Sequence, residues 1–352
     1  MPERVDKFRG RGVPENPANR FVSTFSEQFE DYDPSEDPAP RTQFIPDASA
    51  TLINYNDSPD IPFDASINVY RGCEHGCAYC YARPFHEYLG FSPGLDFETK
   101  IVVKYHAPEL LRQELSSPKW QPQTIAMSGV TDCYQPIERR LQLTRRCLEV
   151  FAEFRNPVGI VTKNYLVTRD LDLLAELARF NCAAVYISIT TLDAALTPKL
   201  EPRASLPALR LAAIRKLSEA GVPVGVMTAP MIPGLNDHEL AKILAAAADA
   251  GARFAGLVPL RLPFAVKDLF ADWLTRHFPD RKDNVLNRVR SLRGGKLNNA
   301  DFGSRMTGEG VWAEQLRQMF DVMTRRLGLN ERGAGLSTAH YRRPAGVQMT
   351  LF

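Results

Sequence analysis

The chain has 352 residues, of which 44% are hydrophobic, and a formal net charge of +2. This length and composition predict one large domain with extensions, or two small domains, around a substantial core. The near-neutral charge excludes a strong overall bias toward nucleic acid or membranes, and no apolar run of about 18 residues predicts a membrane-spanning helix. The polar N-terminus does not resemble a signal peptide, and the six cysteines are too unevenly spaced for a disulfide framework. We therefore expect a reducing, cytoplasmic location.

The first sixty residues are predicted to form an irregular extension. They are rich in Pro, Asp, Glu and Asn, and residues 31–40 are the most loop-like part. On composition, residues 1–40 are expected to be partly disordered.

From Ser66 onward, short apolar strands alternate with helical patterns. The predicted strands are residues 67–70, 124–128, 158–162, 184–189, 222–228 and 254–260. Pro108 opens the first helix, Gly221 ends the fourth, and Asn236 with Glu239 has the capping-box spacing at the start of the fifth. Each strand is thus followed by a helix.

Six strand–helix units in sequence predict a parallel sheet covered by helices. Right-handed crossovers would curl it into a partial (β/α)6 TIM-like barrel over residues 61–265. The alternative is a doubly wound open sheet, but no Gly-rich nucleotide-binding turn follows the first strand. Residues 266–352 are predicted to form a helical extension. Its expected apolar anchors are Leu269, Trp273, Trp312, Leu316, Met319 and Phe320.

The most specific motif follows the first predicted strand. Cys73, Cys77 and Cys80 have the spacing C-x3-C-x2-C, with Gly72 and Gly76 allowing the chain to bend around them. Three close thiolates can hold an iron–sulfur cluster that leaves one iron without a protein ligand. A zinc site would need a fourth ligand such as His75 or His86, and a disulfide would leave one thiol unpaired. The barrel context favours the cluster.

Active-site residues of (β/α) barrels lie at the carboxyl ends of the strands. These positions are polar or rich in Gly and Pro, as a ligand-binding rim requires. They include residues 128–136, residues 162–164, Ser188, Thr190, residues 201–204, residues 230–237 and residues 259–263.

The chain resembles the radical S-adenosylmethionine (radical SAM) superfamily. Within it, the chain is similar to the spore photoproduct lyase-related branch, often labelled DNA repair photolyase-like, and to a bacterial group in that branch. The resemblance extends from about Ser58 to about Met306. Its stretches are residues 70–84, 129–138, 162–164, 201–204 and 233–237.

The resemblance implies a six-unit partial barrel, a [4Fe-4S] cluster on Cys73, Cys77 and Cys80, and S-adenosylmethionine (SAM) on the open iron. A reduced cluster would cleave SAM to methionine and a 5′-deoxyadenosyl radical, which abstracts hydrogen from a substrate. The protein would then need an electron donor of the flavodoxin or ferredoxin type. The cofactor carries the chemistry and the protein orients it.

Several SAM contacts follow by position in the family. Tyr79 would lie against the adenine, although a packed ring that shields the cluster is the alternative. The family has a Gly-Gly-Glu stretch that meets the SAM amino group, and this chain departs from it. Here Ser128, Gly129, Thr131, Asp132 or backbone carbonyls would substitute. Asp132 could equally cap a helix start.

Other positions would surround the rest of SAM. Arg203 is a candidate partner for the carboxylate, because its paired donors match one; a packing arginine is the alternative. Lys163 and Ser188 would hold the ribose or carboxylate, or serve a structural role. Ile232 and Gly234 lie in the loop that passes the adenine in the family, or form a plain Pro-Gly turn.

The remaining cysteines are too far apart for a second cluster. Cys147 and Cys182 are predicted to be core residues. Cys133 lies at a strand end, where spore photoproduct lyase uses a cysteine as a hydrogen-atom donor, and is a candidate for that role.

The substrate is the least determined part. A basic segment could track phosphates, or form a solvated face. It comprises Arg281, Lys282, Arg288, Arg290, Arg293, Lys296 and Arg305. With the branch resemblance it favours a nucleic-acid lesion as one hypothesis. The alternatives are a small molecule, and, for the protein as a whole, a non-catalytic iron–sulfur redox protein or a zinc-stabilised binding module.

Overall fold

The computed structural model describes residue 8, residues 10–22 and residues 40–344. Its main sheet has the strand order β10-β9-β8-β7-β6-β3-β2. The six strands from β3 to β10 pair in parallel, and β2 pairs antiparallel with β3. The bounds are β2 Ile53–Tyr55, β3 Ala65–Ile67, β6 Ile125–Met127, β7 Val158–Thr162, β8 Ala183–Ser188, β9 Val224–Met231 and β10 Phe254–Pro259. The predicted six-unit open barrel is confirmed.

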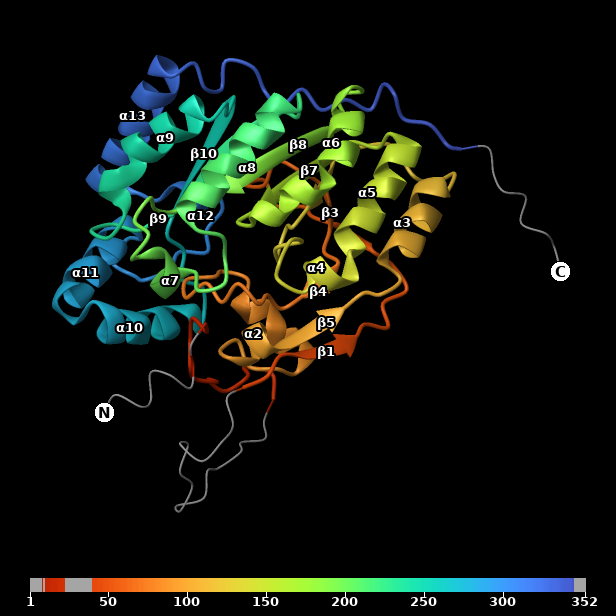
Figure 1. Ribbon diagram of the computed structural model, residues 1–352. Coiled ribbons are helices and arrows are strands. Elements are labelled where there is room, and N and C mark those ends of the chain that lie inside the picture. Colours follow the sequence, from red (N-terminus) through yellow and green to blue (C-terminus); the bar gives the residue numbers. More distant parts are fainter. Residues whose placement is uncertain (1–7, 9, 23–39, 345–352) are drawn as a thin grey trace.

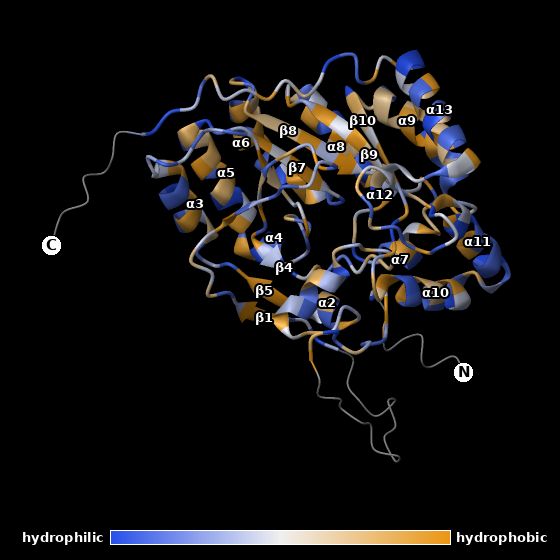
Figure 2. Cartoon of the chain, turned by 180° about the vertical axis from the view of Figure 1, so that it is seen from behind, coloured by the Kyte–Doolittle hydropathy of each residue, from blue (hydrophilic) through white to orange (hydrophobic). Residues whose placement is uncertain are grey.

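Helices cover the outer face of this sheet (Figure 1). They are α3 Ala107–Ser116, α5 Leu143–Phe154, α6 Leu171–Ala178, α8 Pro207–Glu219 and α9 Leu240–Asp249. Each buries leucine, isoleucine or phenylalanine side chains at helical spacing in the main core. Gly221, with φ of 76°, follows α8 and confirms the predicted helix end. Viewed from behind, the strands are predominantly hydrophobic (Figure 2), as a sheet buried on both faces requires.

A second, three-stranded sheet lies beside the cysteine loop. It contains β1 Gln43–Pro46, β5 Lys100–Val103 and β4 Tyr70–Arg71 in the order β1-β5-β4. The prediction that residues 1–60 are irregular is therefore wrong for β1 and β2, which are too short to show periodicity. Residues 1–7, 9 and 23–39, for which disorder was expected, lie outside the described residues.

Short helices fill the strand-end loops. They are η1 Arg83–Leu89, α2 Asp96–Thr99, α4 Glu138–Leu141, η2 Tyr165–Asp170, α7 Thr197–Leu200 and η3 Asp237–Glu239. The predicted capping box before α9 is wrong. Asn236 instead donates to the carbonyls of Thr190 and Pro230, and Glu239 accepts from Thr191 and Leu192. Tertiary contacts between the β8 and β9 loops take the place of local capping.

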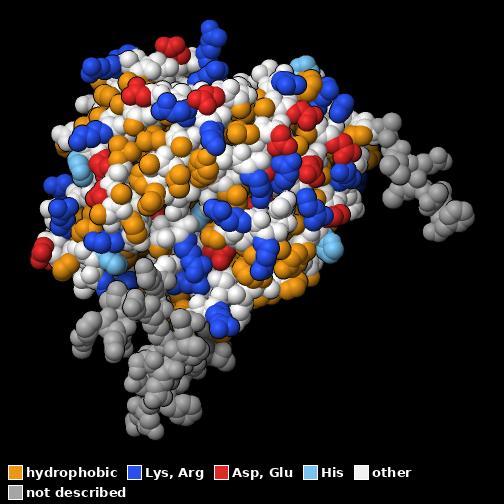
Figure 3. Space-filling view, in the orientation of Figure 1, with side chains coloured by type: hydrophobic (Ala, Val, Ile, Leu, Met, Phe, Trp, Pro, Cys, Tyr) orange, Lys and Arg blue, Asp and Glu red, His pale blue; other side chains and the backbone are white. Residues whose placement is uncertain are grey.

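The C-terminal region is helical, as predicted. It contains α10 Val266–His277, η4 Pro279–Arg281, α11 Lys282–Leu292, α12 Ser304–Thr307 and α13 Gly310–Arg326. Trp273 and Leu316 are buried anchors, whereas Met319 is 43% exposed and does not serve as one. Across the described residues, no helix combines the length and apolar content needed to cross a membrane. The helical face mixes positive and negative side chains (Figure 3), in keeping with the small net charge.

Candidate active site

The cysteine loop follows β4, is bonded to the segment after the carboxyl end of β6 in the main sheet, and is tightly enclosed. Gly72 and Gly76 have φ of 80° and 65°, a region that favours glycine. A Cβ on Gly72 would lie 2.9 Å from the Phe97 carbonyl oxygen, and one on Gly76 would lie 2.7 Å from Glu98 Oε2. Both glycines are thus required by conformation and by close contact.

The three cysteines of this loop are free, and Cys73 and Cys77 are each 7% exposed. Burial raises the pKa of the Cys73, Cys77 and Cys80 thiols, with Asp132 adding to the effect at Cys73 and Glu201 at Cys77. A buried thiol with a raised pKa loses its proton when a strong cation, such as an iron of a cluster, binds the sulfur. The donor set therefore fits an iron–sulfur cluster.

The zinc alternative requires a more compact set of ligands. Zinc needs four ligands converging on a single ion. In the part of the chain that the structure describes, no three His, Cys, Asp or Glu side chains are grouped to hold one metal ion. A four-iron cluster makes a different demand, because each thiolate binds its own iron.

A glutamate and a glutamine tie the cysteine loop to the segment after β6. The Glu74 N–H donates to Gln135 Oε1 over 2.9 Å, and Gln135 Nε2 donates to the Gly72 carbonyl over 3.2 Å. Glu74 Oε2 accepts the Ile137 N–H over 2.8 Å. Gln135 lies in the motif stretch 129–138, and the sequence assigned it no role. Its bonds to Glu74 and Gly72 show that it shapes the cysteine loop.

Asp132 is bound from several sides. Its Oδ1 accepts from Thr162 Oγ1 and the Tyr134 N–H, and its Oδ2 accepts the Lys163 N–H over 2.8 Å. His75 Nδ1, on the cysteine loop, lies 3.3 Å from the same Oδ2. Burial opposes the charge of Asp132, but His75 and the N–H donors lower its pKa to about 2. Asp132 therefore joins the ends of β6 and β7 to the cysteine loop, and α4 begins without it.

The residues next to Asp132 in the segment after β6 also form hydrogen bonds within the protein. Thr131 Oγ1 donates to the Tyr70 carbonyl over 2.6 Å. Ser128, with φ of 78°, accepts the Cys133 N–H on its Oγ over 2.9 Å. The Gly129 carbonyl accepts the Tyr81 hydroxyl over 2.8 Å. These contacts place the predicted SAM-amino segment directly beside the cysteine loop.

Tyr79 is buried, and its hydroxyl donates to Glu201. Glu201 also accepts from Thr190 Oγ1 over 3.0 Å and forms an ion pair with the buried Arg210. Arg210 in turn donates to the Ser188 carbonyl over 2.9 Å. The Tyr79 ring packs with Cys77 and Ile232 in a second hydrophobic core. This arrangement matches the packed-ring alternative, and adenine contact stays a prediction.

Two of the predicted cations lie near the cysteines. The charge of Lys163 opposes the burial-driven rise in pKa of Cys77 and Cys80 and lowers the pKa of Glu201, so Lys163 contributes positive charge to the surroundings of the cysteine loop. Arg203 donates from Nε to the Gly10 carbonyl over 3.0 Å and pairs with Glu74 Oε1 at 3.3 Å. Sequence position alone did not reveal these partners of Arg203.

The β9 loop separates Ile232 from Gly234. Ile232 is buried in the same hydrophobic core as Cys77, whereas Gly234 faces Arg288, which lies 3.4 Å from the position of an added Cβ. Gly234 lines a cleft of about 500 Å³ between α11 and α13. The structure therefore places Ile232, but not Gly234, in the core that includes Cys77.

The other cysteines are all buried. Cys147 and Cys182 are core residues, as predicted. Cys133 is 2% exposed and packs in the main core, and burial raises the pKa of its thiol. Its position gives a hydrogen-donor role no support, and that role stays a prediction.

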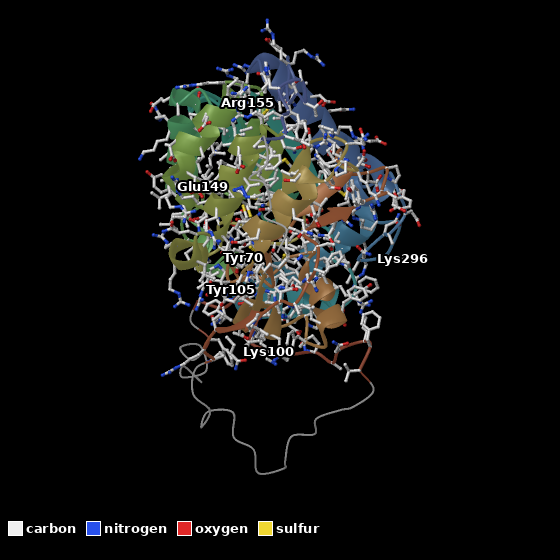
Figure 4. All side chains as sticks on the ribbon, turned by 90° about the vertical axis from the view of Figure 1, so that its right-hand side faces the viewer. Tyr70, Lys100, Tyr105, Glu149, Arg155 and Lys296 are labelled. Carbon is white, nitrogen blue, oxygen red and sulfur yellow. The ribbon has the colours of Figure 1, made fainter. Side chains whose placement is uncertain are left out.

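The basic segment does not form one patch. Arg281 and Arg288 line the cleft by α13, Arg293 is buried with its guanidinium on backbone carbonyls, and Arg305 pairs with Asp60 at 2.5 Å. Lys296 is exposed (Figure 4). The phosphate-tracking hypothesis therefore has no support at Arg293 and Arg305, which bind within the protein.

Comparisons with known proteins agree with this geometry. Residues 67–247 match the family model described as the radical SAM superfamily. Uncharacterized proteins from Mycobacterium bovis and Mycobacterium tuberculosis are 38% identical over 234 residues, which are 66% of this chain and 68% of theirs. An uncharacterized protein from Methanocaldococcus jannaschii is 33% identical over 173 residues, 49% of this chain and 62% of that protein.

Among solved structures, the chain is similar to spore photoproduct lyase complexed with dinucleoside spore photoproduct. The TM-score is 0.60 at 18% identity, covering 81% of this chain and 80% of that chain. A spore photoproduct lyase variant with bound AdoMet and dinucleoside spore photoproduct gives a TM-score of 0.60 at 17% identity, with the same coverage. These likenesses concern the fold.

Proposed function

Because the chain belongs to the radical SAM superfamily of enzymes, we propose that Cys73, Cys77 and Cys80 hold a [4Fe-4S] cluster that binds and reductively cleaves SAM. When bound, the cluster and SAM would supply one-electron cleavage to methionine and a 5′-deoxyadenosyl radical, which takes a hydrogen atom from the substrate. The observation that carries this proposal is the set of three free thiols on one glycine-bent loop at the carboxyl side of a parallel barrel.

The surrounding residues orient and enclose the cofactor. Glu201 and Arg210 fix Tyr79 beside Cys77, and Lys163 supplies a cation for an anionic group of SAM. Thr131, Asp132 and the Gly129 carbonyl bind within the protein, which leaves the backbone carbonyls of Ser128 and Val130 as our candidates for the SAM amino group. Arg203, held by Gly10 and Glu74, serves first to position the cysteine loop.

The test is anaerobic reconstitution with iron and sulfide, followed by dithionite and SAM. We expect about four irons per chain and formation of 5′-deoxyadenosine, both absent from the Cys73/Cys77/Cys80 triple Ala variant. A wild-type protein that behaves like the triple variant would refute the proposal. A protein that builds the cluster without cleaving SAM would instead be the non-catalytic iron–sulfur protein.

We propose a protein electron donor of the flavodoxin or ferredoxin type as partner, because the cleavage consumes one electron. Replacing dithionite with a reduced flavodoxin should sustain 5′-deoxyadenosine formation. An absence of turnover with both a flavodoxin and a ferredoxin, while dithionite still works, would contradict this partner.

For the substrate we propose a nucleic acid, on the basis of rings and arginines around the cysteine loop. Tyr81, directly after Cys80, is 42% exposed, and the Arg261 guanidinium lies 5.7 Å from its ring. Phe264, in the same loop as Arg261, is 56% exposed, and the Arg20 guanidinium lies 3.7 Å from its ring. Exposed rings alternating with cations are the surface on which unpaired bases stack.

The backbone of Phe264 adds a second indication. Its φ of 50° is a region that bulky residues rarely adopt. Such strain persists where the surrounding structure imposes it, and it clusters at functional sites. This backbone conformation keeps the Phe264 ring 56% exposed beside Arg20 rather than in the core.

Binding of single-stranded DNA and RNA oligonucleotides, measured at several salt concentrations, tests this substrate class. We expect binding that weakens with salt and that is reduced in a Tyr81→Ala/Phe264→Ala double variant. If wild type cleaved SAM but did not bind oligonucleotides, or bound them no better than the double variant, a small-molecule substrate would be indicated instead.

A further inference from the structure

An N-terminal segment, residues 10–20, crosses the cysteine loop, and we refer to it as the strap. In Figure 1 the red N-terminal trace passes beside α2. Gly12 lies so close to the loop that an added Cβ would be 1.7 Å from the Gly76 carbonyl oxygen. Val13, next to it, is fully buried. Backbone contact this close makes the strap part of the cysteine-loop structure.

The strap is held by a buried carboxylate. Glu98, at the end of α2, is fully buried and accepts the Gly12 N–H on Oε2 over 3.0 Å and the Val13 N–H on Oε1 over 3.2 Å. The same carboxylate forms a 2.5 Å ion pair with the buried Arg83. Arg11 Nη1 adds a bond to the Glu98 carbonyl over 2.9 Å. Removing any member of such a buried ionic network is costly, because a charge would be left unpaired.

Arg83 transmits this anchoring to a cysteine. Its Nε and Nη2 donate to the Cys77 carbonyl over 3.1 and 2.9 Å, and its Nη1 donates to the Gly94 carbonyl over 2.8 Å. A continuous set of bonds therefore leads from Gly12 through Glu98 and Arg83 to the backbone of Cys77.

The rest of the strap is fastened to the same region. The Leu95 N–H donates to the Glu15 carbonyl over 2.9 Å, and Arg20 pairs with Glu87 at 2.7 Å. Asn19 Nδ2 donates to the Glu87 carbonyl over 2.8 Å. At its other end, the Gly10 carbonyl accepts from Arg203, whose own N–H binds the His75 carbonyl. The strap is thus bonded to both sides of the loop.

We propose that the strap is a latch that fixes the cysteine loop in its cluster-binding shape and shields the cluster from water and oxygen. Gly12 and Glu98 are its positioning residues. The shielding part rests on the proposed function, whereas the positioning part concerns the loop itself.

The decisive variant is Gly12→Ala, because the added Cβ would meet backbone and prevent docking. Gly333→Ala is the matched control, since nothing lies within 4 Å of its added Cβ. After anaerobic reconstitution, we expect the cluster absorption of Gly12→Ala to decay in air roughly tenfold faster than in wild type or control, as local opening exposes it. Equal decay rates in all three proteins would overturn the shielding role.

Positioning is tested without a cluster, by hydrogen–deuterium exchange of the apo protein. In wild type the amides of Gly12 and Val13 should be protected, and in Gly12→Ala both the strap and residues 73–80 should exchange faster. Unprotected Gly12 and Val13 in wild type would overturn the latch, even if Gly12→Ala failed to fold. If wild type built no cluster, the proposed function would be refuted. Hydrogen–deuterium exchange of the apo protein would still show whether the strap positions the cysteine loop.

Discussion

His75 Nδ1 lies 3.3 Å from Asp132 Oδ2, which joins the cysteine loop to the segment after β6. The same carboxylate accepts from Thr162 and Lys163 at the end of β7. This side chain, which is only 10% exposed, thus connects three strand ends and helps to shape the cysteine loop. The predictions below follow from connections of this kind.

Asp132→Asn should destabilise the apo protein by about 2 kcal/mol at pH 7, the value of its pKa shift. The folded pKa is lowered from 3.8 to about 2, so the carboxylate stabilises fully above the unfolded value and loses its effect as the pH falls to about 2. Urea unfolding from pH 7 downward should therefore show the difference shrinking below pH 4. Asp172→Asn, whose side chain is 60% exposed, should change stability by less than about 1 kcal/mol. A pH-independent difference for Asp132→Asn would contradict this account.

Glu201→Gln should cost about 3–5 kcal/mol of unfolding free energy, because it leaves the buried Arg210 charge without its partner. Tyr79→Phe should cost only about 1 kcal/mol, since Glu201 keeps Thr190 and Arg210. Denaturant unfolding of both single variants and the double variant would measure this. Because the two residues are in contact, we expect the double variant to be non-additive; simple additivity would show that the Tyr79–Glu201 bond contributes nothing.

Single Ala substitutions of Cys73, Cys77 and Cys80 should each prevent stable assembly of the four-iron cluster, because a thiolate ligand is lost. Cys182→Ala is the control, since Cys182 is also buried but lies just before β8, at the amino-terminal end of that strand. Iron and sulfide content after reconstitution provides the measurement. Loss of the cluster in Cys182→Ala, or its retention in Cys77→Ala, would contradict the ligand assignment.

Phe264→Gly should raise stability by about 0.5–1 kcal/mol while weakening oligonucleotide binding. Glycine relieves the positive φ, and the lost ring removes a stacking surface that is worth about 1–3 kcal/mol per base. Thermal unfolding and oligonucleotide titration would measure the two effects.

Arg155→Gly is its matched control. Arg155 also has φ of 50° and lies 3.7 Å from a phenylalanine ring, that of Phe180, but it precedes β7 at the amino-terminal edge of the sheet, near the top of Figure 4. It should gain similar stability without any change in binding. Equal oligonucleotide affinity of wild type and Phe264→Gly would remove this ring from the substrate surface.

The sequence predicted the regular elements well, because their periodicity is a local property. β7 has the predicted bounds, and four other barrel strands lie within a few residues of their predicted positions. The first predicted strand, residues 67–70, was wrong as one strand, because the structure divides it between the end of β3 and the start of β4. The prediction also failed where local patterns compete with tertiary contacts. Asn236 and Glu239 have the spacing of a cap, yet their side chains join the β8 and β9 loops instead.

In the candidate site, too, some features follow from the local sequence and others only from the tertiary structure. The spacing of Cys73, Cys77 and Cys80 and the order of strands and helices determined the cluster motif and its place in a barrel, because both are encoded in contiguous residues. Only the tertiary structure decided that Glu98 and Arg83 link the strap to Cys77, and that Cys133 is buried. Hydrogen bonds between residues separated by 86 positions, as for Gly12 and Glu98, leave no periodic trace in the chain and form only when folding brings the two segments together.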